Sequence, residues 1–316
     1  MALEPADVGP YPINGLTPLS WAVTGGHEAV VKMLLERGDV SASTADGGGQ
    51  TPLFIATCKG HDGIVKMLLE RWDVNPNTAD GDGATPLYVA AWEGHKGVAE
   101  ILPERNDINP DTVDGVTGET PLFRAAWEGR EEIVKMLLER NDVNPNATDQ
   151  HGRTPLFGAT REGHEGVVKM LLGRADVNPN TTDKCDQTPL FIAARKGCDG
   201  ILKMLLERND ANPNAANYDG ETPLFRAALW KLEGAVKLLL ERGDVNPNIA
   251  NNIGRTPLFE AASKGHEGVV RMLLARGDIN PNTPDRYGHT PLFRAAKEGH
   301  KGVVKMLLLA EIQFPL

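Results

Sequence analysis

The stretch Thr-Pro-Leu-Phe-x-Ala-Ala, which stands at 120–126, 222–228 and 290–296, decides the fold of this chain. Its Thr-Pro-Leu core recurs nine times, at Thr17, Thr51, Thr85, Thr120, Thr154, Thr188, Thr222, Thr256 and Thr290. Every interval is 34 residues long except the 35 between Thr85 and Thr120. A fixed period of this size is typical of stacked supersecondary units, each of which contacts only its neighbours. The 316 residues therefore predict one solenoid instead of two globular domains.

One repeat, that of Thr290, predicts two helices and a loop. The Thr290 hydroxyl can cap a helix, and Pro291 suits the first helical position because its missing N–H has no partner there. Glu298-Gly299-His300 breaks this helix, and the apolar run 302–308 predicts a second one. The run Asp-Val-Asn-Pro-Asn, as at 142–146, then forbids helix. Each unit is predicted to be helix, turn, helix and a projecting β-turn loop.

The residue five positions after each repeat threonine is an alanine in all nine units. A larger side chain there would hold neighbouring repeats apart, so we expect close helix packing at these positions. The alanines are Ala22, Ala56, Ala90, Ala125, Ala159, Ala193, Ala227, Ala261 and Ala295.

In these motifs the chain resembles the ankyrin repeat family, whose signature is Thr-Pro-Leu-His-x-Ala followed by Gly-His and an apolar second helix. The signature histidine is replaced by an aromatic residue in eight units and by Ser20 in the first. We expect apolar packing to take over its role. The aromatic residues are Phe54, Tyr88, Phe123, Phe157, Phe191, Phe225, Phe259 and Phe293.

The resemblance implies an all-α ankyrin-repeat solenoid of nine repeats over residues 13–310, with a concave groove lined by the first helices and flanked by the loop tips. Residues 1–12 would then be an N-terminal extension and 311–316 a C-terminal tail. Such arrays, with their 34-residue period, look like those of fungal multi-domain proteins, some of them receptor-like. The nucleotide-binding module of those receptors has no counterpart in this sequence.

Three places depart from the repeat. Pro103 lies within the second helix of the third repeat and predicts that this helix ends early. The loop 111–118 carries the extra residue, and 229–232 replaces the Glu-Gly-His turn of the seventh repeat. Two alternative explanations fit all three departures: sequence drift in a redundant scaffold, or reshaping of these repeats for a partner.

Composition and charge argue against several functional classes. The formal net charge of −10 disfavours nucleic acid as a partner, because phosphate binding needs clustered Lys and Arg. The cysteines, Cys58, Cys185 and Cys198, lack metal-ligand spacing and predict free thiols in a reducing compartment. The N-terminus has no signal-peptide features, and no apolar run approaches the roughly 20 residues of a membrane span. We expect a cytoplasmic or nuclear protein without membrane contact.

The candidate metal-binding and catalytic motifs lack the residues or the spacing that their chemistry requires. Asp73 to Asn77 begins like a calcium loop, but Thr78 and Ala84 stand where glycine and glutamate are needed. Six histidines occupy the Gly-His turns of repeats that stack about 10 Å apart, too far for shared ligation. They are His27, His61, His95, His164, His266 and His300. We predict structural roles for them, with no metal, no cofactor and no catalytic residues.

The residues four, seven and eight positions after each repeat threonine are expected to line the groove. They include nine basic and five acidic side chains and four of the five tryptophans. Trp and Arg dominate binding hot spots. We therefore predict a partner-binding groove of Trp21, Trp92, Arg124, Trp127, Arg161, Arg195, Arg226, Trp230 and Arg294. The alternative is that some arginines pair with a glutamate of the neighbouring repeat.

The sequence thus favours a non-enzymatic scaffold for a protein or peptide with acidic patches. A small-molecule or enzymatic role of the same groove, an interaction module of a receptor-like signalling protein, and nucleic acid along the basic stripe are the alternatives. The last helix, 303–309, has little polar cover. Either the segment 312–316 folds over it as a lid, which favours a monomer, or the exposed end associates end to end.

Overall fold

The computed structural model describes residues 15–313, with side chains up to residue 310. These residues form eighteen α-helices and one short 3-10 helix, and no strand occurs among them. The predicted all-α class is therefore confirmed. The chain divides into two compact units, unit 1 of residues 1–150 and unit 2 of residues 151–316. The predicted extension, 1–12, lies outside the described residues.

Each unit is built from helix pairs that follow the repeat. In unit 1 the first helices are α1 (Pro18–Thr24), α3 (Pro52–Lys59), α5 (Pro86–Glu93) and α7 (Pro121–Trp127). Their partners are α2 (Glu28–Leu35), α4 (Asp62–Leu69), α6 (Lys96–Ile101) and α8 (Glu131–Glu139).

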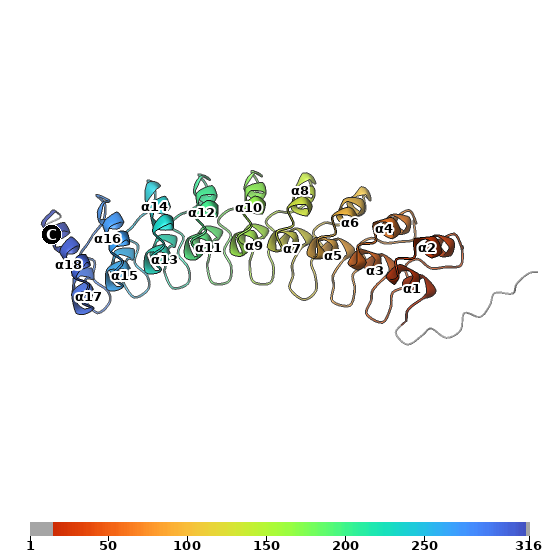
Figure 1. Cartoon of the computed structure of the whole chain (residues 1–316), viewed down its shortest axis with the longest axis horizontal. Coiled ribbons are helices and arrows are strands. Elements are labelled where there is room, and N and C mark those ends of the chain that lie inside the picture. The colour runs from red at the N-terminus through yellow and green to blue at the C-terminus, as the bar shows by residue number, and fades with distance from the viewer. Residues whose placement is uncertain (1–14, 314–316) are drawn as a thin grey trace, which may run out of the picture. The chain divides into compact units, whose positions relative to one another are not determined.

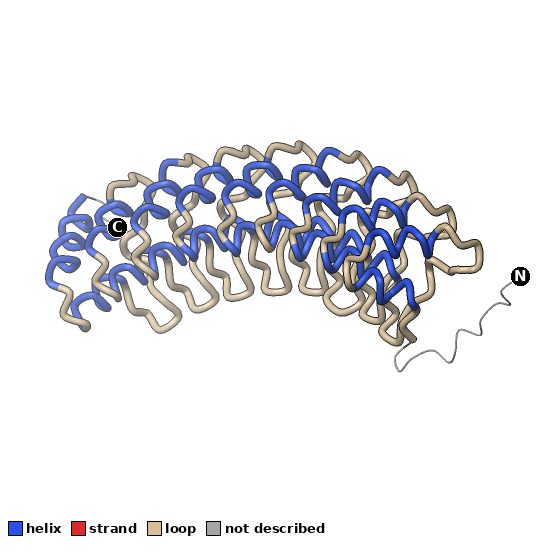
Figure 2. Tube along the Cα trace, turned by 45° about the vertical axis from the view of Figure 1, so that its right-hand side comes forward, coloured by secondary structure: helices blue, strands red, loops and turns tan. Residues whose placement is uncertain are grey.

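Unit 2 repeats the same arrangement. Its first helices are α9 (Pro155–Glu162), α11 (Pro189–Lys196), α13 (Pro223–Leu229), α15 (Pro257–Ser263) and α17 (Pro291–Lys297). Its second helices are α10 (Glu165–Leu172), α12 (Asp199–Leu206), α14 (Glu233–Glu241), α16 (Glu267–Leu274) and α18 (Lys301–Gln313). In each unit the first helices form one row and the second helices another, and successive members of a row pack together (Figure 1). The loops extend beyond the first helices (Figure 2). In each unit separately, we call the surface of the first helices and these loops the first-helix face.

Every first helix begins at its repeat threonine, as the motif predicts. Thr120 Oγ, for example, accepts a hydrogen bond of 3.2 Å from the backbone N–H of Phe123. Proline follows each capping threonine at the helix start, and the threonine backbone is extended in all nine. The cap satisfies one of the N–H groups that a helix N-terminus leaves without a partner. It fixes where each first helix starts, and therefore which side chains face outward.

The core of each unit lies between the helix rows. Eight of the nine motif alanines are fully buried, and Ala22 is 5% exposed. The aromatic residue that replaces the signature histidine is buried in seven repeats, with at most 3% of its surface exposed. Phe293 is 49% exposed, because α17 is the last first helix among the described residues. Apolar packing has thus taken the place of the signature histidine, as expected.

The turns between paired helices need a left-handed residue. Glycine provides it in most repeats, for example Gly94 with φ 83° and Gly163 with φ 85°. Lys231 takes the same conformation with φ 58° in the divergent seventh repeat. The next turn residue reaches the previous repeat, where His95 Nε2–H donates to the Cys58 carbonyl at 3.2 Å. This contact agrees with a structural role for the turn histidine.

Pro103 shortens the second helix of its repeat. The helix α6 has six residues and ends at Ile101, whereas α4 has eight. Early termination is therefore confirmed. The last turn is retained as a 3-10 helix, η1 (Leu102–Glu104), because proline removes one backbone donor but tolerates the tighter turn.

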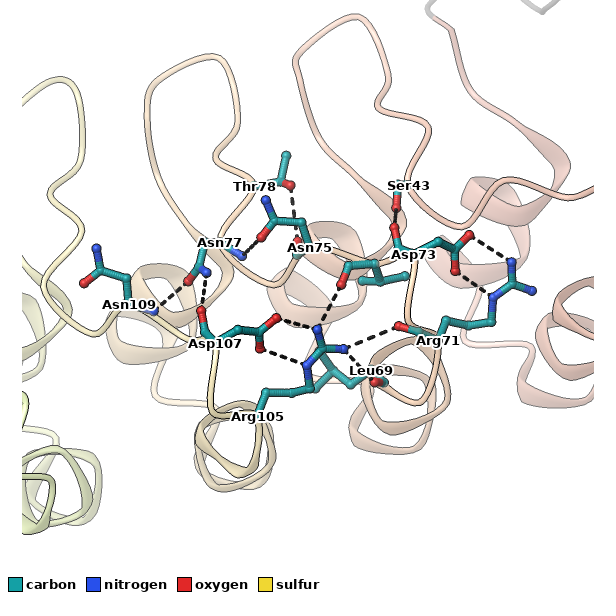
Figure 3. Close-up of polar contacts among 11 residues, drawn as sticks. Ser43, Leu69, Arg71, Asp73, Asn75, Asn77, Thr78, Arg105, Asp107 and Asn109 are labelled. Atoms are coloured by element: carbon teal, nitrogen blue, oxygen red, sulfur yellow. Dashed lines mark hydrogen bonds and ion pairs between the residues drawn. The ribbon is translucent and has the colours of Figure 1, made fainter.

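An arginine near the end of most second helices fastens the helix to the preceding repeat (Figure 3). Arg105 donates to the carbonyl oxygen of Leu69, the last residue of α4, at 3.1 Å. Its other nitrogens pair with Asp107 at 2.5 and 2.9 Å. Helix C-termini leave carbonyl groups without partners, and a guanidinium there also complements the helix dipole. The Arg-x-Asp sequence after these second helices is thus a C-terminal cap shared between neighbouring repeats.

The Asn-Pro-Asn run forms a ladder between loops. Asn77 Nδ2 donates to the Asp107 carbonyl at 2.6 Å, and Asn77 Oδ1 accepts from the backbone N–H of Asn109 at 2.8 Å (Figure 3). The same pair of contacts recurs in unit 2 from Asn180, Asn214 and Asn248. These amides are held by backbone groups, which explains why the run recurs as a structural turn.

At the end of unit 2, α18 continues to Gln313 and so takes in the first three residues of the predicted tail. Residues 314–316 lie outside the described residues. The predicted lid, which depends on them, is therefore outside the described part of the chain.

Candidate functional site

Two predicted groove arginines form ion pairs within their own repeats. Arg124 lies 2.6 Å from Glu119, the residue before the capping threonine. Arg226 lies 2.7 Å from Glu221 in the same relation. In the next repeat the signs are exchanged, with Arg255 at 2.9 Å from Glu260. Pairing with a glutamate of the neighbouring repeat, the alternative raised by the sequence, is therefore replaced for these residues by pairing between a loop end and its own helix.

Arg124 is fixed from several sides. It also lies 3.3 Å from Glu128, donates to the Tyr88 hydroxyl at 3.2 Å, and stands over the Trp92 ring at 4.7 Å from its centroid. Only 15% of its side chain is exposed. Burial raises the pKa of Glu119, and the nearby Arg124 opposes that rise. Arg124 is thus a wall of the first-helix face, with its charge balanced by two carboxylates.

A pocket of ≈ 390 Å³ opens beside Arg124, entirely within unit 1. Its aromatic lining comes from first helices α3 and α5, and its acidic lining comes from two loops and the end of α5. The residues that line it are Gln50, Phe54, Cys58, Asp80, Asp82, Ala84, Tyr88, Val89, Trp92, Glu93, Asp114, Val116, Thr117 and Arg124. The sequence prediction included only Trp92 and Arg124 of these.

Negative charge dominates this pocket, since Asp80, Asp82, Glu93 and Asp114 face the single guanidinium of Arg124. Burial, together with the charges of Glu93 and Asp80, raises the pKa of the Cys58 thiol to about 11. The pKa of Asp114 is lowered in spite of burial, because Thr117 and backbone N–H groups donate to its carboxylate. The pocket thus places four acidic side chains around one guanidinium.

The tryptophans of the prediction differ in exposure. Trp21, Trp92 and Trp230 expose 58%, 45% and 61% of their surface. Trp127 is half-buried and stacks on Phe123, with ring centroids 5.8 Å apart. The fifth tryptophan, Trp72, is 91% exposed after α4, outside the predicted set. Three of the four predicted tryptophans are thus available on the first-helix face.

Unit 2 gathers positive charge on this face. Burial lowers the pKa of Arg195, and so does repulsion from Arg226 and Arg161 on the neighbouring first helices. Arg195 donates to the neutral Gln187 side chain at 3.2 Å. We call Arg161, Arg195 and Arg226 the arginine cluster.

The structure therefore separates the predicted groove residues into groups. Trp92 and Arg124 meet in the unit 1 pocket, and three arginines meet in the arginine cluster. Trp21 on α1, Trp127 on α7, Trp230 after α13 and half-buried Arg294 on α17 belong to neither. Prediction missed the loop carboxylates and the glutamate partners. The sequence does carry a signal for these ion pairs, because residues 119 and 124, 221 and 226, and 255 and 260 have opposite charges.

The sequence model of the ankyrin repeats, which spans three copies, matches residues 2–80, 42–114, 87–183, 175–251 and 234–315. The chain belongs to the ankyrin repeat family. Ankyrin repeats generally mediate protein–protein interaction, and the family is typically a non-enzymatic module. A comparison with curated proteins finds no match. Along residues 15–313, no helix is both long and apolar enough to cross a membrane.

Proposed function

We propose that this chain is a non-enzymatic scaffold that binds a protein or peptide partner on its first-helix face. The arginine cluster of unit 2 carries the proposal. Three guanidinium groups lie on successive first helices, and the pKa of Arg195 is lowered first by burial and also by the charges of Arg226 and Arg161. A partner with acidic side chains offsets the repulsion when it binds. Exposed Trp230 offers an apolar contact on the same face.

We propose the cytoplasm as the compartment in which the chain performs this function. Cys58, Cys185 and Cys198 are all free thiols. Such thiols persist where glutathione and thioredoxin keep cysteines reduced. The chain would then meet its partner inside the cell, as one monomer.

Charge reversal on the first-helix face tests the proposal. Arg161→Glu/Arg195→Glu changes the cluster, whereas Lys169→Glu/Lys203→Glu makes the same charge change at exposed positions of α10 and α12 in the same repeats. Wild type and the lysine variant should capture the same acidic protein from native lysate, and the arginine variant should lose it. Both variants are first checked for an unchanged melting temperature. Equal capture by all three baits would move the binding surface away from the cluster.

A further inference from the structure

We propose that the unit 1 pocket binds an arginine side chain from an extended, basic segment of a partner protein. This site is independent of the arginine cluster and has the opposite charge preference. Its ≈ 390 Å³ lies within the range of about 300 to 1,000 Å³ typical of ligand pockets. The pocket can therefore hold one long side chain with adjoining peptide backbone.

Charge complementarity identifies the occupant as a cation. Asp82 and Glu93 are exposed at the pocket, and neither has an ion-pair partner among residues 15–313. The guanidinium of Arg124 is balanced by Glu119 at 2.6 Å and Glu128 at 3.3 Å. Arg124 therefore leaves the other carboxylates of the pocket uncompensated. A cationic side chain supplies the missing charge.

The carboxylates are held in place before any ligand binds. Asp80 Oδ1 accepts backbone hydrogen bonds from Asp82 at 3.1 Å and Ala84 at 3.0 Å, which shapes the loop. Asp114 accepts from Glu119 N–H at 2.7 Å and from Thr117 Oγ at 2.6 Å in the next loop. Binding to such loops costs little ordering entropy, and preorganisation of this kind favours affinity.

Aromatic walls favour arginine over lysine. Phe54, Tyr88 and Trp92 line the pocket, and Trp92 is 45% exposed. The guanidinium of Arg124 stands over one face of the Trp92 ring at 4.7 Å, which is the kind of contact that we propose for the occupant. A guanidinium stacks on aromatic rings and pairs with carboxylates through two N–H groups, whereas an ammonium is a compact, strongly hydrated charge. The combination of flat rings and carboxylates thus fits arginine.

The indole N–H signal of Trp92 reports binding in the full chain by nitrogen–proton NMR, with the signal assigned through Trp92→Phe. The probe is arginine blocked at both ends as N-acetyl and N-methylamide, at millimolar concentrations. We expect a saturable shift of the Trp92 signal. The blocked citrulline analogue, which has nearly the same shape without the charge, should leave the signal in place. Equal shifts by both analogues would overturn the proposal, and tighter binding of the blocked lysine analogue would overturn the choice of arginine.

Two matched variants locate the effect. Asp82→Asn/Glu93→Gln removes the two uncompensated carboxylates without touching the loop hydrogen bonds of Asp80 or Asp114. It should weaken binding by on the order of tenfold, as expected for two partly exposed ion pairs. Glu132→Gln/Glu139→Gln makes the same charge change at exposed positions of α8 and should bind like wild type. Unchanged affinity of the first variant would contradict the site, and would leave the proposal for the arginine cluster untouched.

Discussion

At the scale of single residues, the ion pair between the residue before the capping threonine and the residue four positions after it is the main feature beyond the repeat signature. Glu221 precedes its partner Arg226, whereas Arg255 precedes Glu260. The two orders occupy the same place in successive repeats. Where both positions carry charge in an ion pair, as in these repeats, either order of the two signs is accommodated.

Exchange of the charges in one pair tests this interpretation. Glu221→Arg alone places two guanidinium groups together, at side chains that are 12% and 21% exposed in the wild type. We expect a loss of about 2 to 3 kcal/mol in the free energy of unfolding, because a largely buried charge loses its partner. Glu221→Arg/Arg226→Glu should recover most of it. Chemical denaturation of the two variants measures both, and a double variant as unstable as the single one would contradict the interpretation.

Lys231 stores strain that a glycine would release. Its φ of 58° is a conformation that costs L-residues roughly 1 to 2 kcal/mol. Lys231→Gly should therefore raise the free energy of unfolding by about 1 kcal/mol. In the reverse change, Gly163→Lys, the new Cβ meets no atom within 4 Å, and the change should destabilise the chain by a similar amount. Because no clash arises there, the two variants together report the cost of the backbone conformation and not of side-chain packing. Denaturant midpoints provide the comparison, and no gain from Lys231→Gly would refute the strain.

At the scale of elements, the second helices show how one residue alters a repeat. Eight repeats have leucine where α6 has Pro103. The leucine at this position in α4, Leu69, is 8% exposed, so it contributes apolar burial as well as a helical turn. The shorter α6 thus reflects a local backbone restriction inside an otherwise regular array.

Restoring that leucine should lengthen the helix. Pro103→Leu is expected to convert η1 into the last turn of α6 and to stabilise the chain by about 1 to 3 kcal/mol. Slower amide hydrogen exchange at 102–105 would show the new turn, and thermal denaturation would show the gain. Unchanged exchange there would mean that packing against neighbouring repeats, and not proline, ends α6.

At the scale of the whole molecule, the Arg-x-Asp caps link stability to pH. Hydrogen bonds from the arginine lower the pKa of the capping aspartate in both units, as for Asp73, Asp107, Asp210 and Asp244. Because the folded pKa lies below the unfolded value of about 3.9, this contribution is complete above about pH 5 and is lost as pH falls. Buried Glu119 and partly buried Glu221 act in the opposite sense, since burial raises their pKa values.

The aspartates outnumber these glutamates, so the urea midpoint should fall steadily between pH 5 and about pH 2. Replacing one cap, Asp210→Asn, should flatten this dependence slightly in unit 2. Urea titrations at several pH values measure the trend. A midpoint that rises on acidification would show that the buried glutamates dominate instead.

The sequence predicts those parts of the fold that depend on neighbours in the chain. The Thr-Pro caps, the buried alanines and the early end at Pro103 follow from backbone chemistry within one repeat. The Asn77–Asp107 ladder and the Asp80 wall of the pocket depend on loops that meet about one repeat apart, and no local pattern encodes them. Arg124 was predicted as a binding residue because its position is outward, and Glu119 was overlooked because it precedes the motif.

A peptide-display selection on the intact chain tests the central claim most directly, namely that the first-helix face binds proteins through an acid-binding cluster and an arginine-binding pocket. The account predicts two enriched classes of peptide. Acidic peptides should be lost with Arg161→Glu/Arg195→Glu, and arginine-containing peptides should be lost with Asp82→Asn/Glu93→Gln. Peptides without a charge preference, or both classes retained by both variants, would contradict it.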